Sequence, residues 1–208
     1  MRIIGGALAG RTIIAPAGRE TRPTADRVRE ALFNRIVHAA LPGVTEAGPL
    51  SGPVLDLHAG SGALGLEALS RGAPRADFVD FAPSACAVLQ RNIEALSLLP
   101  RARIHKTRVE HFVRRADGPY TLLFADPPYA DGSHLDEILV AVNERKLLAP
   151  GALVVLEHAP SPAPSKHQPG LQFVDERKYG QTVLTFFVAR DAGVAGETTT
   201  PHGNDRGS

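Results

Sequence analysis

The chain of 208 residues carries a net charge of +1 and is 43% hydrophobic, which is enough to bury one large core. No apolar run reaches the roughly 20 residues of a membrane span, and the glycines and arginines near the N-terminus exclude an ordinary signal peptide. The single cysteine, Cys86, excludes an internal disulfide and a cysteine metal cluster, and the histidines lack a ligand spacing such as HExxH. We therefore expect a cytoplasmic protein with no bound metal and no membrane partner.

Residues 1–50 are predicted to be an extension of a larger domain. Two short strands, over 2–5 and 11–15, are joined by a turn that contains glycine. A helix follows from an N-cap at Thr24 to about residue 40. The stretch 41–53 is rich in glycine and proline, which is typical of a linker.

From residue 54 onward, predicted strands alternate with predicted helices. This alternation indicates βαβ units, and therefore an α/β fold with a mostly parallel sheet. Strands are expected over residues 54–58, 76–80, 102–106, 120–125 and 151–157, and helices over 63–71, 84–97, 109–115 and 133–146. Two further strands, over 171–178 and 182–189, are expected to add an antiparallel hairpin. We assign 51–190 to this domain, and the polar tail 191–208 is expected to be disordered.

Positive charge is concentrated in two segments. Residues 1–35 contain seven arginines and three acidic residues, and residues 101–115 contain six basic residues and one acid, Glu110. Arginine suits contacts with phosphates and bases. Charge alone leaves open whether these segments bind nucleic acid or form an ordinary solvated surface.

A glycine loop follows the first strand of the α/β domain. The sequence "LHAGSGALG" places Gly60, Gly62 and Gly65 in the spacing GxGxxG between a strand and a helix, which is typical of nucleotide binding. Asp56 precedes the glycines by four residues, and a negative charge there suits the ammonium of S-adenosylmethionine better than a pyrophosphate. Asp80, at the end of the next strand, is placed to accept hydrogen bonds from a ribose. A tight structural turn is the alternative.

The stretch "LLFADPPYADG" ends an apolar strand in an acid, two prolines and an aromatic ring. The Asp126 carboxylate and the Pro127 carbonyl can accept the two hydrogens of an exocyclic base amine, which exposes the nitrogen lone pair for methylation. Pro127 and Pro128 each fix their own φ, so little reorganisation is needed. Tyr129 can stack on a base that has swung out of folded nucleic acid. A proline-rich strand end with a capping aspartate is the alternative.

With these segments combined, the sequence resembles class I, Rossmann-like amino-methyltransferases, whose signature is [DNS]-P-P-[YFW]. The segments "MRIIGGALAGRTI", "TRPTADRVREALFN", "LDLHAGSGALGLEALSRGA" and "RKYGQTVLTFF" narrow the resemblance to the bacterial small-subunit rRNA guanine-N(2) methyltransferases, the RsmD family. The resemblance runs from Met1 to about Arg190. It implies a seven-stranded, mostly parallel sheet with a C-terminal antiparallel hairpin, preceded by a hairpin and a helix.

The resemblance also implies methyl transfer from S-adenosylmethionine to the N(2) amine of a guanine in 16S rRNA, within an assembling small subunit. The arm and the "TRPT" segment would close over the cofactor and touch RNA, and we expect a monomer. Catalysis is implied for Asp126, Pro127, Pro128 and Tyr129, cofactor binding for Thr24, Asp56, His58, Gly60, Ser61, Gly62, Asp80 and Phe81, and RNA contact for Arg2, Arg11, Arg22 and Arg27.

Two positions depart from the family pattern. His58 stands where phenylalanine or tyrosine is usual. Thr107 and Arg108 occupy the region in which the family commonly has an aspartate that binds the adenine amino group. Either Glu110 takes over that contact or backbone groups alone hold the adenine.

Three other functions are considered. The first is an adenine-N(6) methyltransferase acting on RNA or DNA, although no separate target-recognition domain follows the sheet. The second is a non-enzymatic RNA-binding or assembly factor with a relict pocket, which the intact glycine loop argues against. The third is a dinucleotide-dependent oxidoreductase, which Asp56 and the DPPY segment disfavour.

Overall fold

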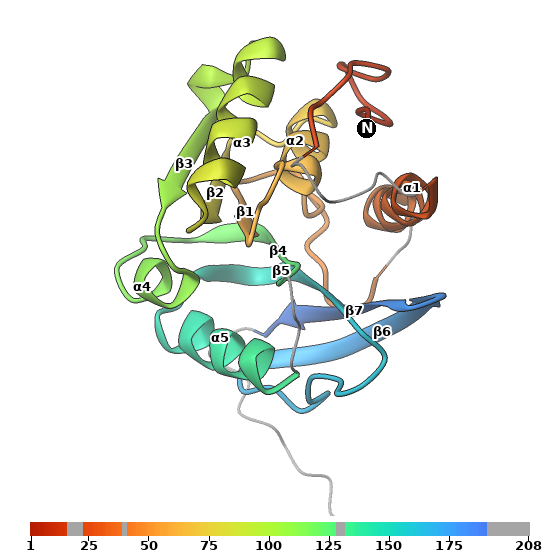
Figure 1. Cartoon of the computed structure of the whole chain (residues 1–208). Coiled ribbons are helices and arrows are strands. Elements are labelled where there is room, and N and C mark those ends of the chain that lie inside the picture. Colours follow the sequence, from red (N-terminus) through yellow and green to blue (C-terminus); the bar gives the residue numbers. More distant parts are fainter. Residues whose placement is uncertain (16–22, 39–40, 128–131, 191–208) are drawn as a thin grey trace, which may run out of the picture.

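A computed structural model describes residues 1–15, 23–38, 41–127 and 132–190. They form a seven-stranded sheet in the order β3-β2-β1-β4-β5-β7-β6, with helices on both faces (Figure 1). The strands are β1 (Val54–Leu57), β2 (Ala76–Asp80), β3 (Ala102–Lys106), β4 (Tyr120–Ala125), β5 (Leu148–His158), β6 (Leu171–Tyr179) and β7 (Thr182–Ala189). The helices are α1 (Pro23–His38), α2 (Ala63–Ser70), α3 (Pro83–Ala95), α4 (Val109–Val113) and α5 (Gly132–Glu144), with a short 3-10 helix over Leu99–Arg101.

The sheet is parallel from β3 to β5, and β7 pairs antiparallel with both β5 and β6. This confirms the predicted mostly parallel sheet and its C-terminal hairpin. The chain moves outward from β1 to β2 and β3, and then crosses to β4 on the other side of β1. The strand order therefore reverses between β1 and β4, and in open α/β sheets ligands bind at the carboxyl ends of such strands.

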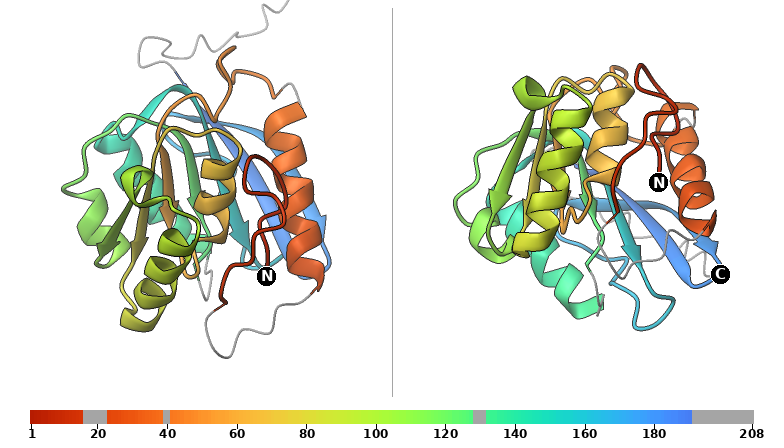
Figure 2. Two further views of the ribbon diagram at one scale, coloured as in Figure 1. Left: turned by 90° about the horizontal axis from the view of Figure 1, so that it is seen from above. Right: turned by 45° about the horizontal axis from the view of Figure 1, so that its top comes forward.

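Alternate residues of the central strands pack on opposite faces of the sheet, which produces two hydrophobic cores. On one face, Phe78 and Phe124 are buried beneath α1, α2, α3 and the N-terminal arm, residues 1–15. Figure 2 shows this arm beside α2 and α1. On the other face, Leu55 and Leu123 are buried beneath α4 and α5. Full burial of each such side chain contributes about 2 kcal/mol.

Most predicted element boundaries agree with the structure to within a few residues, and β2, β3 and β4 agree at both ends. Helix α1 begins at Pro23, so Thr24 lies in its first turn and is not the predicted N-cap. Strand β5 begins at Leu148, three residues before the predicted start, because Leu148 still pairs with Tyr120 of β4 across a shift in the register of the two strands. Among the described residues, none of the helices is long and apolar enough to cross a membrane. The predicted tail 191–208 lies outside the described residues.

The two strands predicted for the N-terminal arm are wrong in extent, because only a single antiparallel bridge joins Arg2 to Thr12. Side chains of α2 and α3 bind the backbone of the arm instead. Glu67 accepts hydrogen bonds from the backbone N–H groups of Ile4 and Gly5, at 2.8 and 2.7 Å. The Asn92 side chain likewise pairs with the backbone of residue 14. The arm is thus docked on α2 and α3, and backbone hydrogen bonds also join its two halves without forming regular strands.

Candidate active site

Acidic side chains meet at the carboxyl ends of three adjacent strands. Leu57 pairs with Val79 of β2 and with Ala125 of β4, so the next residues, Asp80 and Asp126, lie on either side of His58. Asp56 belongs to the same group, because both of these acids raise its pKa. The structure therefore brings the glycine loop and the start of the DPPY segment to one crevice, as the sequence predicted.

The glycine loop needs its glycines for two distinct reasons. Gly60 and Gly62 have φ values of 56° and 80°, in the left-handed region that side chains rarely adopt. A Cβ at Gly62 would lie 2.3 Å from the Leu89 side chain, and one at Gly65 would lie 2.3 Å from the Phe78 ring. Glycine thus lets the loop pack tightly between β2 and α3. This leaves its backbone at the rim of the crevice.

Asp80 is held in place by the loop that it faces. One carboxylate oxygen accepts a hydrogen bond from the Gly60 N–H at 2.9 Å, and the other accepts one from the Ala82 N–H at 2.8 Å. Its side chain remains partly exposed. A hydrogen-bond acceptor at the end of β2 therefore has a fixed orientation before any ligand arrives.

Asp56 differs from Asp80 in its burial. It is only 2% exposed and accepts a hydrogen bond from the Gly65 N–H at 2.9 Å. Burial raises the pKa of Asp56 to about 8, the Gly65 hydrogen bond opposes this, and repulsion from Asp126 and Asp80 adds to it. The carboxyl group is therefore mostly protonated at pH 7 in the free protein. The prediction that Asp56 carries the negative charge of this rim needs that correction.

His58 lies in the middle of the crevice with an unusual backbone. Its φ is 60°, and its Nδ1 is buried without a hydrogen-bond partner among the described residues. Burial, followed by repulsion from His134, lowers the pKa of His58 to about 4, so the ring is neutral at pH 7. The His134 ring is 5.9 Å away, and His134 Nε2 lies 3.7 Å from a Glu110 carboxylate oxygen. His58 thus offers an unused polar atom inside the site.

Phe81 is the most exposed part of the crevice, with 54% of its surface open. The Arg108 guanidinium carbon lies 5.4 Å from the centre of the Phe81 ring, which is a cation–π arrangement. Sequence reasoning noticed Arg108 only as a departure from the family pattern. The pairing of β2 with β3 brings it over Phe81, since Phe81 directly follows β2 and Arg108 is the second residue after β3.

Other predicted site residues are described only in part. Pro127 is buried directly after Asp126. The Ser61 hydroxyl lies 3.5 Å from the sulfur of Met1, so the N-terminal arm reaches the glycine loop. The residues Arg22, Pro128 and Tyr129 lie outside the described residues, and only the backbone of Thr24 is described, within α1. In the described part of the chain, no group of three or more histidines, cysteines or acids is arranged to hold a metal ion.

The arginines of the N-terminal region fall into two groups. Arg2, Arg11 and Arg27 are exposed, although one Nη of Arg11 donates a hydrogen bond to the Ala95 carbonyl at 2.6 Å. Arg29, in contrast, is 5% exposed and pairs with Asp26 at 3.0 Å. The structure thus leaves the predicted RNA-contact residues that it describes on the surface.

Comparisons with known proteins agree with this geometry. The family described as conserved hypothetical protein 95 matches residues 1–188. Ribosomal RNA small subunit methyltransferase D of Escherichia coli (strain K12) is 36% identical over 157 residues, covering 76% of this chain and 74% of that protein. YlbH of Bacillus subtilis (strain 168), described as a candidate rRNA methyltransferase, is 36% identical over 163 residues, covering 76% of this chain and 82% of that protein. The solved structure of yhhF from Escherichia coli, a candidate methyltransferase, has a TM-score of 0.76 at 31% identity and covers 91% of this chain and 98% of that one. The predicted class I methyltransferase fold is confirmed.

Proposed function

We propose the following function for this chain, which belongs to the family described as conserved hypothetical protein 95, in agreement with its resemblance to the RsmD family. The protein transfers a methyl group from S-adenosylmethionine to the exocyclic N(2) amine of a guanine in 16S rRNA. The observation that carries this proposal is the meeting of the glycine loop, Asp80 and Asp126 at the point where the strand order reverses. The names of the relatives support ribosomal RNA of the small subunit as the substrate.

The described residues fit S-adenosylmethionine. Its sulfonium and ammonium groups are cationic, and the crevice presents the carboxylates of Asp80 and Asp126 on either side of β1, which would repel the pyrophosphate of a dinucleotide. Asp80 is oriented to accept hydrogen bonds from a ribose diol, and the exposed face of Phe81 suits an adenine ring. The unpaired Nδ1 of His58 gives the site one further polar contact. We infer the same role for Gly60, Ser61 and Gly62 through the backbone of the loop.

When bound, S-adenosylmethionine supplies an electrophilic methyl group. Asp126 and the Pro127 carbonyl hold the base amine by accepting its two hydrogens, so that the nitrogen lone pair points toward the methyl carbon. The cofactor would supply the methyl group and would leave as a neutral thioether, so the amine would gain a methyl group and would have to lose one proton. The Asp126 carboxylate then takes the proton that the methylated amine loses. The buried position of Pro127 fixes its carbonyl beforehand.

The remaining proposed residues position the partners. Pro128 stiffens the clamp and Tyr129 stacks on the flipped base, as the DPPY signature implies. The N-terminal arm covers the cofactor, since Met1 already touches Ser61, and Arg2, Arg11, Arg22 and Arg27 contact RNA. We place the reaction in the cytoplasm, on an assembling small subunit, with a monomeric enzyme.

The test is methylation of small subunits from a strain that lacks this activity. Asp126→Ala should lower methyl incorporation by about a hundredfold or more, because the amine loses one of its acceptors, while calorimetry should still detect S-adenosylmethionine binding. Glu144→Ala, an exposed acid at the end of α5, is the matched control and should behave as wild type. Methyl incorporation near the wild-type level in Asp126→Ala would refute the amine clamp. Mass-spectrometric mapping of the product separates guanine-N(2) from adenine-N(6) methylation.

A further inference from the structure

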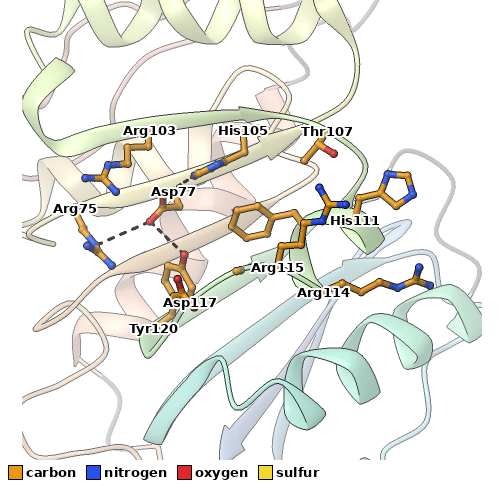
Figure 3. Close-up of a pocket in the computed structure, with 13 residues that line it drawn as sticks. Arg75, Asp77, Arg103, His105, Thr107, His111, Arg114, Arg115, Asp117 and Tyr120 are labelled. Atoms are coloured by element: carbon orange, nitrogen blue, oxygen red, sulfur yellow. Dashed lines mark hydrogen bonds and ion pairs between the residues drawn. The ribbon is translucent and has the colours of Figure 1, made fainter.

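A second hollow, away from the glycine loop, lies along the edge strand β3. It is a cavity of about 770 Å³ between β3, the amino-terminal parts of β2 and β4, and the end of α4 (Figure 3). We call it the β3 groove. Its charged lining consists of four arginines and two aspartates, namely Arg75, Arg103, Arg114, Arg115, Asp77 and Asp117.

Asp77, at the floor of the β3 groove, is already engaged. It is 5% exposed and lies 2.7 Å from His105 Nε2, and it accepts a hydrogen bond from the Tyr120 hydroxyl at 3.3 Å. Arg75 Nε lies 4.0 Å from the same carboxylate. Burial and the nearby Asp77 raise the pKa of Tyr120, so its hydroxyl stays a donor. The polar groups at the floor of the groove therefore bind one another, and Arg103, Arg114 and Arg115 take no part in these contacts.

The other three arginines surround this floor from two elements. Arg103 projects from β3, whereas Arg114 and Arg115 follow α4, and all three are exposed. Figure 3 shows them around the same hollow as Arg75 and Asp77. Helix α4, which Arg114 and Arg115 follow, is held against β3, because the Phe112 ring lies 4.6 Å from the His105 ring, centre to centre.

These arginines have no ion-pair partner within the described residues. Other arginines of the chain are used internally: Arg71 pairs with Glu67 at 2.8 Å, and Arg101 donates to the carbonyls of residues 69 and 73. The lining holds four arginines against two aspartates, of which Asp77 is already engaged, and this excess of positive charge favours an anionic partner. The planar guanidinium suits phosphate oxygens in particular.

We propose that the β3 groove binds the phosphate backbone of the RNA substrate, outside the site of methyl transfer. The groove begins at Thr107, whose N–H donates to the Asp80 carbonyl at 3.1 Å, and continues along β3 toward Arg75. The groove therefore adjoins the crevice, and an RNA strand that extends from the crevice along β3 can reach Arg103, Arg114 and Arg115. The inference rests on the proposed function in that the partner is RNA.

A pair of charge-reversal variants tests the groove. Arg103→Glu combined with Arg115→Glu is compared with Arg91→Glu combined with Arg145→Glu, which changes the net charge equally at exposed positions outside the groove. With a 16S rRNA transcript as the probe, the groove variant should raise the Kd by about 10- to 100-fold near physiological salt. The slope of log K against log salt should fall by about 2, whereas the control should change little.

Further measurements keep the outcome clear. S-adenosylmethionine affinity and the melting temperature should stay at wild-type values in the groove variant, since these side chains are exposed and lie outside the crevice. An unchanged Kd for the transcript, or an equal loss in both variants, would overturn the inference. So would binding of inorganic pyrophosphate that the groove substitutions abolish while RNA affinity is retained. If Asp126→Ala abolishes methylation but the groove variant binds RNA normally, the proposed function stands and the groove inference fails.

Discussion

The crevice at the carboxyl ends of β1, β2 and β4 and the β3 groove share one sheet but have opposite charge. The crevice gathers carboxyl groups, and the most buried of them, Asp56, avoids part of the electrostatic cost by holding a proton. The groove gathers exposed arginines above one buried acid, Asp77, whose charge its neighbours satisfy. A net charge of +1 conceals this separation.

The difference teaches how one small domain can handle two ligands of opposite charge. A cationic cofactor is favoured where acids face a glycine loop, and a polyanion is favoured where arginines face solvent. The N–H of Thr107, directly after β3, donates a hydrogen bond to the carbonyl of Asp80 at the end of β2. The crevice and the β3 groove are therefore adjacent at the carboxyl ends of these two paired strands. Variants in one region should therefore affect one ligand and spare the other.

The largest expected effect comes from Asp80→Ala. This substitution removes the proposed ribose acceptor and the anchor of the Gly60 N–H, and hydrogen bonds to a charged group contribute about 2 kcal/mol each. The Kd for S-adenosylmethionine should rise about a hundredfold in calorimetric titration. The control is Asp117→Ala, which removes an acid from the groove and should leave that Kd unchanged. Equal effects of the two substitutions would contradict the separation of the two regions.

A smaller effect is expected from Phe81→Ala. Loss of a stacking surface for adenine should raise the Kd for S-adenosylmethionine about tenfold, because such stacking contributes roughly 1–3 kcal/mol. Arg108→Ala keeps the ring and removes only the guanidinium above it, so the loss should be smaller. A larger loss for Arg108→Ala than for Phe81→Ala would mean that the guanidinium, and not the ring, holds the adenine. Calorimetry with adenosine as a competitor measures the contribution of this end of the ligand.

The crevice could be predicted from the sequence because its signals are local. Asp56, Gly60 and Gly62 share one short segment, and Asp80 and Asp126 each end a strand whose apolar pattern is clear. Parallel strands bring such residues to a single edge of the sheet, so their meeting follows from the fold class. The protonation of Asp56 could not be predicted, since it depends on burial beneath α2.

The groove and the docking of the arm could not be predicted for a related reason. The groove arginines lie just before β2, within β3 and just after α4, and only the strand order places them around one hollow. The arm forms a single bridge instead of two strands, and Glu67, which lies far along the chain, holds it in place by accepting hydrogen bonds from the N–H groups of Ile4 and Gly5. The periodicity of apolar residues in a sequence carries no information about a side chain, such as Glu67, that binds backbone groups distant along the chain.

The smallest expected effect concerns pH and again separates the two regions. The pKa of Asp56 is about 8 in the folded protein and 3.8 in the unfolded chain. Between pH 3.8 and 8 the folded state therefore binds more protons at Asp56 than the unfolded state does, and the free energy of unfolding falls as the pH rises. The pKa of His58 has the opposite shift, from 6.5 to about 4, so its contribution is lost only as pH falls below 6.5. Between pH 6.5 and 8, Asp56 therefore acts without opposition from His58.

In Asp56→Asn, the fall in the free energy of unfolding between pH 6.5 and 8 should shrink by about 1.5 kcal/mol, because one pKa unit corresponds to about 1.36 kcal/mol and the linkage weakens as the pH approaches the folded pKa. Urea unfolding at several pH values in this range measures the slope. Asp117→Asn is the control, since Asp117 is exposed on the rim of the groove and lies outside the crevice, and it should keep the wild-type slope. A slope that persists in Asp56→Asn would show that Asp56 is ionised in the free protein, and the acidic crevice would then carry all three of its charges before the cofactor binds.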